Sequence, residues 1–171
     1  EQTKDVWTHL VDIRKSFEPR AEELAKKYAL APYTMFIGSG ALWGETILFS
    51  MCILEEMQWK RTRYITSADF FHGTLELVEP GVPVFLFMGE DENRKLDERV
   101  RAFLNRGVTG DTDINVIDTA EFAIPGLDDE FRVIVSPWIL TVLVTDRLAR
   151  YYETVTKHNL KYRRYYHQFD Y

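Results

Sequence analysis

The chain has 171 residues, 46% of them hydrophobic and 14% aromatic, which is enough apolar surface for one compact domain with its own core. Its formal net charge of -6 argues against nucleic-acid binding, because proteins meet a phosphate backbone with basic surfaces. The single cysteine, Cys52, cannot form an intrachain disulfide and fits a reducing cytoplasm, and the absence of a signal peptide or an apolar run of about 18 residues argues against membrane insertion.

The first predicted element is an amphipathic helix over residues 4–28, which Pro19 is able to interrupt. Its apolar side chains recur every three or four positions, at Val6, Leu10, Ile13 and Phe17. A short buried strand is predicted at residues 33–37 (YTMFI), and Gly38-Ser39-Gly40 ends it. Residues 41–59 are apolar on most faces of a helix, so we expect that helix to be largely buried.

The remaining sequence continues this alternation of strands and helices. Strands are predicted at residues 62–66, 82–88 and 114–118, with a fifth at residues 131–135 (FRVIV). Helices are predicted at residues 91–106, which are highly charged, and from residue 137 to about residue 160. The last eleven residues (KYRRYYHQFDY) differ in composition, because they hold five aromatic and three basic side chains.

Strands that alternate with helices and are almost continuously apolar are typical of a parallel sheet covered on both faces. We therefore expect a single doubly wound α/β domain over residues 1–171, with a five-stranded parallel sheet flanked by helices. In such sheets ligands bind at the carboxyl ends of the strands. Three segments are predicted to lie there: Gly38-Ser39-Gly40, Ser67 and Gly89-Glu90.

Gly38, Ser39 and Gly40 are the candidate substrate-binding residues. Glycines allow a positive φ, and the N–H groups that open the following helix are able to meet an anion such as a sugar phosphate. The segment matches neither the GxGxxG pattern nor a P-loop, so a plain strand-to-helix turn explains it equally well from residue types alone.

Glu55 and Glu56 close the apolar helix, where the negative end of the helix dipole disfavours them. Either Lys60 and Arg61 compensate their charge, or one of the two carboxylates acts as a base. His72 follows 16 residues after Glu56, and it is either an ordinary surface histidine or the partner of that base.

Other kinds of site are poorly supported by the sequence. His9, His158 and His167 have no metal-ligand spacing with His72 or Cys52, which argues against zinc. Ser39 has no evident catalytic triad, and Cys52 lies within a helix, where we expect it to be inert.

Residues 36–79 resemble a sugar isomerase (SIS) domain. The resemblance rests on the glycine-rich turn after the first strand, the glutamate that ends the next helix (Glu56), and the F-HG motif at Phe71-His72-Gly73. It is strongest to the carboxy-terminal one of the two SIS domains in the isomerase half of glucosamine-6-phosphate synthase and in the fructosamine-6-phosphate deglycases. The resemblance implies the flavodoxin-like SIS fold.

The deglycases are the better match of the two. Ile53 stands where the synthases have a lysine, and Thr74 stands where they have a proline. The closing RRYYHQFDY is similar to the ending of fructoselysine-6-phosphate and fructose-asparagine-6-phosphate deglycases, closest to the latter, with departures at Gln168 and Phe169.

This resemblance implies that a phosphorylated sugar-amine, such as fructose-asparagine 6-phosphate, is hydrolysed to glucose 6-phosphate and a free amino acid. Glu56 and His72 are the implied catalytic residues, with no metal or cofactor. It also implies a homodimer in which His72 reaches Glu56 from the neighbouring subunit. The chain, which begins with Glu1, is expected to be the carboxy-terminal half of a two-domain enzyme and to have little activity alone.

Two alternatives remain open at this point. The domain is also compatible with an aldose–ketose isomerase or a synthase that uses the same glutamate, and with a non-catalytic phosphosugar-binding module. The sequence leaves open which amino acid the substrate carries. Arg163 and Arg164 in the tail either meet a substrate carboxylate or are simply solvated.

Overall fold

The computed structural model describes residues 4–107, 110, 112–122 and 124–170. Its sheet has the order β2-β1-β3-β4, and every neighbouring pair is parallel. The strands are β1 (Tyr33–Gly38), β2 (Arg61–Ile65), β3 (Val84–Met88) and β4 (Ile114–Asp118). Four of the predicted strands are therefore confirmed, and β2 forms one edge of the sheet within the described residues.

The amino-terminal helical segment consists of two helices, α1 (Val6–Ser16) and α2 (Glu18–Tyr28). The break falls at Phe17, and Pro19 lies in the first turn of α2. Proline is tolerated there because the first N–H groups of a helix have no partner within the helix.

The helix predicted over residues 41–59 is present, but its type changes along its length. It begins as a short 3-10 turn, η1 (Gly40–Leu42), continues as α3 (Trp43–Ile47) and ends as the π-helical η2 (Leu48–Met57). Further along the chain lie α4 (Ser67–Phe70), η3 (Thr74–Leu77), α5 (Arg94–Leu104) and η4 (Thr119–Glu121).

The prediction of a fifth strand at residues 131–135 is wrong, because these residues lie in α6 (Asp129–Leu140). That helix continues through the π-helical η5 (Thr141–Leu148) into α7 (Ala149–Thr156). The β-branched residues favour a strand locally, but Asp129 and Glu130 complement the positive end of the helix dipole. Val135 and Ile139 then bury one helical face, and tertiary packing outweighs local preference.

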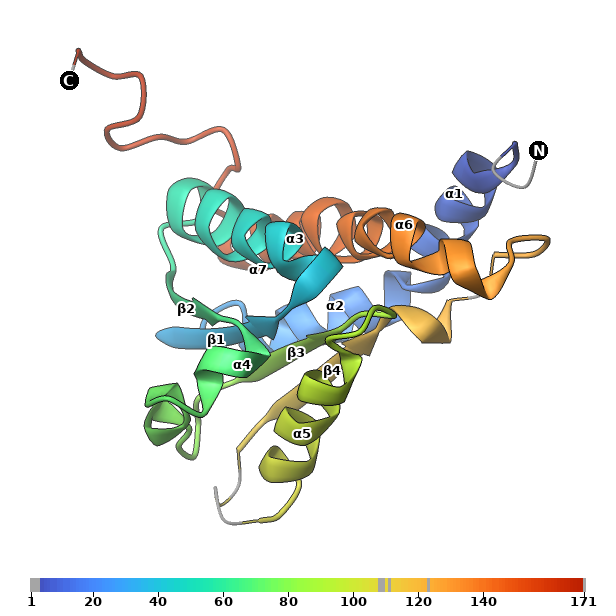
Figure 1. Cartoon of the computed structure of the whole chain (residues 1–171). Helices are drawn as coiled ribbons and strands as arrows, with labels where there is room; N and C mark the ends of the chain where they lie inside the picture. The colour runs from blue at the N-terminus through green and yellow to red at the C-terminus, as the bar shows by residue number, and fades with distance from the viewer. Residues whose placement is uncertain (1–3, 108–109, 111, 123, 171) are drawn as a thin grey trace.

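Figure 1 shows the helices divided between the two faces of the sheet, with α2, α3, α6 and α7 on one side and α4 and α5 on the other. Successive residues of β3 point to opposite sides, as strand geometry requires. Phe85 and Phe87 belong to the larger core, which includes residues of α1, α2 and the carboxy-terminal helices. Leu86 belongs to the smaller core with Phe70 and Val100. The doubly wound α/β prediction is confirmed, with four strands in place of five.

Candidate active site

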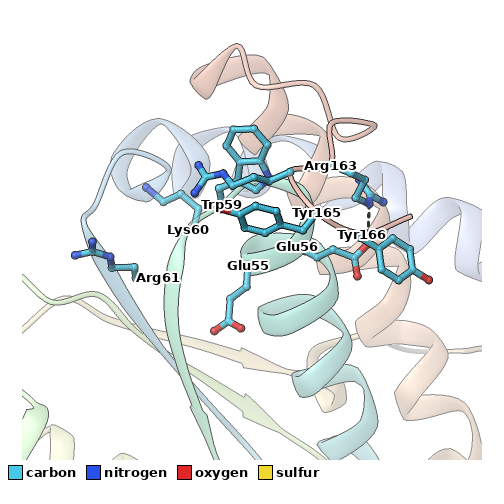
Figure 2. A pocket seen from close by; sticks show the side chains of 9 residues that line it. Glu55, Glu56, Trp59, Lys60, Arg61, Arg163, Tyr165 and Tyr166 are labelled. Atoms are coloured by element: carbon cyan, nitrogen blue, oxygen red, sulfur yellow. Dashed lines mark ion pairs between the residues drawn. The ribbon is translucent and has the colours of Figure 1, made fainter. Parts of the chain in front are cut away.

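Glu56 lies at a cavity that we call the helix-end cavity, located where η2 ends and β2 begins. The carboxy-terminal tail (residues 159–170) lies beside this helix end, as Figure 2 shows. The cavity has a volume of about 480 Å³. The residues that line it are Glu55, Glu56, Trp59, Lys60, Arg61, Arg163, Arg164, Tyr165 and Tyr166.

The two adjacent carboxylates have different partners. Thr62 Oγ1 donates a hydrogen bond to Glu55 Oε1 over 2.5 Å, which directs Glu55 toward strand β2. Glu56 faces the tail, where its Oε1 lies 2.8 Å from Nε of Arg163. Figure 2 shows the two side chains extending in different directions from the helix end. Glu56 is thus the carboxylate held by the tail.

The Glu56–Arg163 ion pair is well covered for a contact near the surface. The Arg163 side chain is 18% exposed and that of Glu56 is 31% exposed. Arg163 Nη1 also donates to the carbonyls of Leu160 and Tyr162, each over 2.8 Å. Because the guanidinium is held by its own backbone as well as by Glu56, its position at the cavity is well defined.

Hydrogen bonds and ring contacts attach His158 and the start of the tail, which follows it, to the helices. Gln58 Nε2 donates to the carbonyl of His158 over 2.6 Å, and the Leu160 N–H donates to Glu153 Oε1 over 2.9 Å. The His158 ring lies 4.4 Å from Trp59 and 5.3 Å from Tyr162, between ring centroids. These contacts hold the first residues of the tail in place beside the cavity.

Trp59 supports a second arginine of the tail. Arg164 Cζ lies 4.2 Å from the centroid of the Trp59 ring, which is the geometry of a cation–π contact. Trp59 has a φ of 52°, a left-handed conformation that bulky residues rarely adopt. Such strain occurs preferentially at ligand sites and active sites.

Within the described residues, Lys60 and Arg61, which were expected to balance the negative charges of the two adjacent glutamates, form no ion pair with either glutamate. Lys60 Nζ donates to the carbonyl of Ala31 over 2.7 Å, and burial lowers the pKa of this amine. Arg61 is exposed at the cavity rim. Arg163, more than 100 residues distant in sequence, balances Glu56 in their place.

Cys52 is a poor nucleophile in this environment. Burial raises the pKa of its thiol, and the negative charge of Glu56 raises it further. The thiolate is the reactive form, so both effects disfavour reaction at Cys52. The expectation of an inert cysteine agrees with this environment.

His72 lies far from Glu56 of the same chain. It is exposed in the turn that follows α4, beyond the carboxyl end of β2, whereas Glu56 precedes the amino end of that strand. A strand of the five residues of β2 spans roughly 16 Å. The structure therefore does not bring Glu56 and His72 together within one chain.

The glycine turn is occupied by the protein's own polar groups. The N–H of Ala41, which opens the helix, donates to Asp91 Oδ2 over 2.6 Å. Gly40 has a φ of +53° and leaves no room for a side chain, since an added Cβ would lie 2.1 Å from Asp91 Oδ2. Ser39 is buried, and its Oγ accepts the Ser67 N–H over 2.7 Å. An anion binding here would meet the Asp91 carboxylate, so a binding role for Gly38, Ser39 and Gly40 stays a prediction.

Sequence reasoning missed Asp97, which cross-links the carboxyl ends of the strands. Ser67 Oγ donates to Asp97 Oδ1 over 2.5 Å, and the Gly89 N–H donates to Oδ2 over 3.4 Å. Burial raises the pKa of this carboxyl to about 6, although the hydrogen bonds oppose that rise. Asp97 follows no strand directly, so only the folding of α5 against β3 places it there.

A second cavity, of about 430 Å³, lies beside the ends of β3 and β4. Arg94 there forms two hydrogen bonds with Asp118, of 2.9 and 2.6 Å, and Arg132 donates to Glu90 Oε1 over 2.9 Å. Each of the two guanidinium groups is already paired with a carboxylate of the same chain. The predicted carboxyl-end crevice is thus a network of internal ion pairs.

Within the residues that the structure describes, no group of three or more His, Cys, Asp or Glu side chains is arranged to hold a metal ion. Over the same part of the chain, none of the helices is both long and apolar enough to cross a membrane.

The chain is similar in sequence to two curated deglycases. It is 30% identical to the fructosamine deglycase of Bacillus subtilis, over 85% of this chain and 43% of that protein. It is also 30% identical to the fructoselysine 6-phosphate deglycase of Escherichia coli K12, over 97% of this chain and 45% of that protein. The chain thus spans less than half the length of these relatives. No family model matches it.

The fold is also found among solved structures. A candidate phosphosugar isomerase from Bacillus subtilis superimposes with a TM-score of 0.91 at 27% identity, over 100% of this chain and 51% of that one. Together with the curated relatives, this structure confirms the resemblance to sugar isomerase domains and, among them, to the fructosamine and fructoselysine 6-phosphate deglycases.

Proposed function

We propose that this chain, given its confirmed resemblance to the deglycases, is a SIS domain of an enzyme that hydrolyses fructosamine 6-phosphates. The products would be glucose 6-phosphate and the free amine, and fructose-asparagine 6-phosphate is the proposed substrate. The observation that carries the proposal is the position of Glu56, a carboxylate that faces a cavity large enough for a small ligand. The two deglycase relatives support it independently.

The proposed reaction needs one base and one acid. The Glu56 carboxylate takes a proton from C1 of the open-chain ketose while the acid protonates the C2 carbonyl oxygen, and the C1–C2 enaminol forms. Protonation at C2, with loss of the proton on nitrogen, gives an imine at C1. Water adds to that carbon, the C1–N bond breaks, and the amine leaves as the aldehyde of glucose 6-phosphate forms. One water is consumed, and no oxidant or reductant is required.

We propose that His72 supplies the acid function from a second copy of the chain. Its ring is exposed, and it lies at the other end of β2 from Glu56 in its own chain. A twofold-symmetric dimer that places His72 of one copy at the helix-end cavity of the other would form two equivalent sites. This proposal explains how an acid–base pair works when its members are separated within each chain.

We further propose that this chain is one of two SIS domains in its enzyme. The shares of 43% and 45% of the relatives' lengths are compatible with that arrangement. Much of the sugar-phosphate binding would then fall to the other domain, and the glycine turn occupied by Asp91 agrees with such a division. The 171-residue chain alone is expected to have little activity.

A product assay on the full-length protein tests the proposed function. Fructose-asparagine 6-phosphate is expected to yield glucose 6-phosphate and free asparagine in equal amounts. Fructosamine 6-phosphates that remain intact, while the protein converts fructose 6-phosphate to its aldose, would favour an isomerase. That second candidate rests on the candidate phosphosugar isomerase with which the chain superimposes.

A further inference from the structure

The tail places a cation directly at the proposed base. The ion pair between Arg163 Nε and Glu56 Oε1 measures 2.8 Å and joins two residues that are far apart in sequence. A base whose oxygen accepts a hydrogen bond from a guanidinium is less available to take a proton from carbon. A functional Glu56 therefore needs another anion to replace it on Arg163 Nε when substrate arrives.

Three of the other charged residues at the cavity have contacts of their own, and Arg61 is exposed at its rim. Glu55 accepts the Thr62 hydroxyl, Lys60 donates to a backbone carbonyl, and Arg164 lies over the Trp59 ring. Among the residues that the structure describes, Arg163 is the cation that pairs with the proposed base. It is also the arginine whose placement is set by two backbone carbonyls.

A carboxylate ligand suits the Arg163 guanidinium. Arginine binds carboxylates through two parallel N–H groups, and the edge that contains Nε offers one such pair. A substrate carboxylate at that edge would replace Glu56 on Nε, which frees the Glu56 oxygen. The same contact would then recognise the substrate and release the base.

The short distance between Arg163 and Glu56 limits where the substrate carboxylate lies. In an amino acid joined to the sugar through its α-amine, three covalent bonds of about 1.5 Å connect C1 to the carboxylate carbon. In lysine joined through its ε-amine, seven such bonds separate them. Glu56 must reach the C1 proton, so a cation in contact with Glu56 suits the carboxylate of the α-linked compound.

We propose that Arg163 recognises the carboxylate of the amino-acid part of the substrate and so selects fructosamine 6-phosphates linked through an α-amine. This inference rests on the proposed function, because it takes Glu56 as the base at C1. Hydrogen bonds to the Leu160 and Tyr162 carbonyls would hold Arg163 in place for this role, and Trp59 supports the neighbouring Arg164.

Equilibrium binding to the full-length protein tests the inference without turnover if it is measured in a Glu56→Gln background. Three 6-phosphates are compared: fructosyl-asparagine linked through the α-amine, its analogue made from 3-aminopropanamide, which lacks the carboxylate, and fructosyl-lysine linked through the ε-amine. The first is expected to bind at least about tenfold more tightly than the others. Adding Arg163→Ala should abolish this difference, and Arg163→Lys should retain part of it. Arg106→Ala, at an exposed arginine after α5, should leave it unchanged.

Turnover with Glu56 intact separates this inference from the proposed function. Arg163→Ala is expected to lower kcat/KM at least about tenfold for the α-linked compound. For the carboxylate-free analogue it should leave kcat/KM unchanged or raise it, because Glu56 then has no guanidinium partner. An equal loss of kcat/KM for the two compounds would overturn the proposed role of Arg163. Equal affinity for the compounds with and without the carboxylate would overturn it as well. Binding that depends on Arg163 and the carboxylate, without release of amino acid by the unaltered protein, would overturn the proposed function and support recognition by Arg163.

Discussion

Thr62 donates its hydroxyl hydrogen to Glu55 Oε1 over 2.5 Å, and this bond distinguishes two adjacent glutamates at the end of η2. Glu55 is directed toward the edge strand β2 and has a neutral partner. Glu56 is left to face the tail and pairs with Arg163. A pair that looks redundant in sequence is therefore divided by the fold into one carboxylate directed toward the sheet and one paired with Arg163 at the helix-end cavity.

Glu56→Gln in the full-length protein is expected to reduce kcat by roughly 10²- to 10⁴-fold, the usual contribution of a general base. KM for the α-linked substrate should stay the same or fall, because the amide has nearly the same shape as the carboxylate but competes less for Arg163. Steady-state release of amino acid measures both. Glu55→Gln is the matched control and should stay within about tenfold of the unaltered enzyme, since its amide oxygen is still able to accept the Thr62 hydrogen. The reverse order of effects would assign the base to Glu55.

Mixing two inactive variants tests whether His72 acts across a dimer. Glu56→Gln and His72→Ala are each expected to be nearly inactive. When equal amounts are unfolded together and refolded, half of the dimers are mixed, and each mixed dimer carries one intact site. Roughly a quarter of the full activity should therefore return. If no activity returns although mixed dimers are shown to form, His72 does not serve the Glu56 of another subunit.

Asp97 should make stability depend on pH. It is 1% exposed, and burial raises the pKa of its carboxyl to about 6, whereas an unfolded aspartate titrates near 3.9. Between these values the folded state retains a proton that the unfolded chain has released. The free energy of unfolding should therefore fall as the pH rises from about 4 to 6, by at most about 1.4 kcal/mol per pH unit.

Urea unfolding of the chain across that pH range measures this slope for the unaltered protein and for Asp97→Asn. The substitution removes the titrating group and should flatten the profile. Asp12→Asn, at an exposed acid of α1, is the control and should retain the slope. A slope that survives in Asp97→Asn would assign the titration to another group.

Gly40→Ala is expected to destabilise the chain by about 1–3 kcal/mol. Gly40 has a φ of +53°, and an added Cβ would lie 2.1 Å from Asp91 Oδ2 and 2.6 Å from Asn93 Nδ2. The Asp91 carboxylate would have to leave the Ala41 N–H. Thermal or urea unfolding measures the change.

Gly44→Ala is the matched control for that substitution. Gly44 lies in α3, and an added Cβ there meets no atom within 4 Å apart from its chain neighbours and the nearby helix backbone. Alanine should stabilise this helix by about 0.5–1 kcal/mol, since it loses less backbone freedom on folding. Equal effects at both positions would contradict the proposed clash with Asp91.

Local patterns were sufficient to predict most of the elements. The apolar runs at β1 and β3 are long enough to identify buried parallel strands. The edge strand β2 and the partly buried β4 have weaker patterns, but all four predicted strands are confirmed. Residues 131–135 were misassigned because β-branched side chains favour a strand only when neighbours offer a sheet to join. In this chain they lie in α6, and Val135 is the one of the five that is buried.

The sequence by itself determined the strand and helix alternation and the motif that marks Glu56 and His72, because both depend on residues close together in the chain. Tertiary structure alone decided which groups surround them. It brought Arg163 to Glu56, placed Asp91 in the glycine turn, and separated His72 from Glu56 by the length of β2. Contacts between distant segments depend on the packing of the whole core, and no local pattern records them.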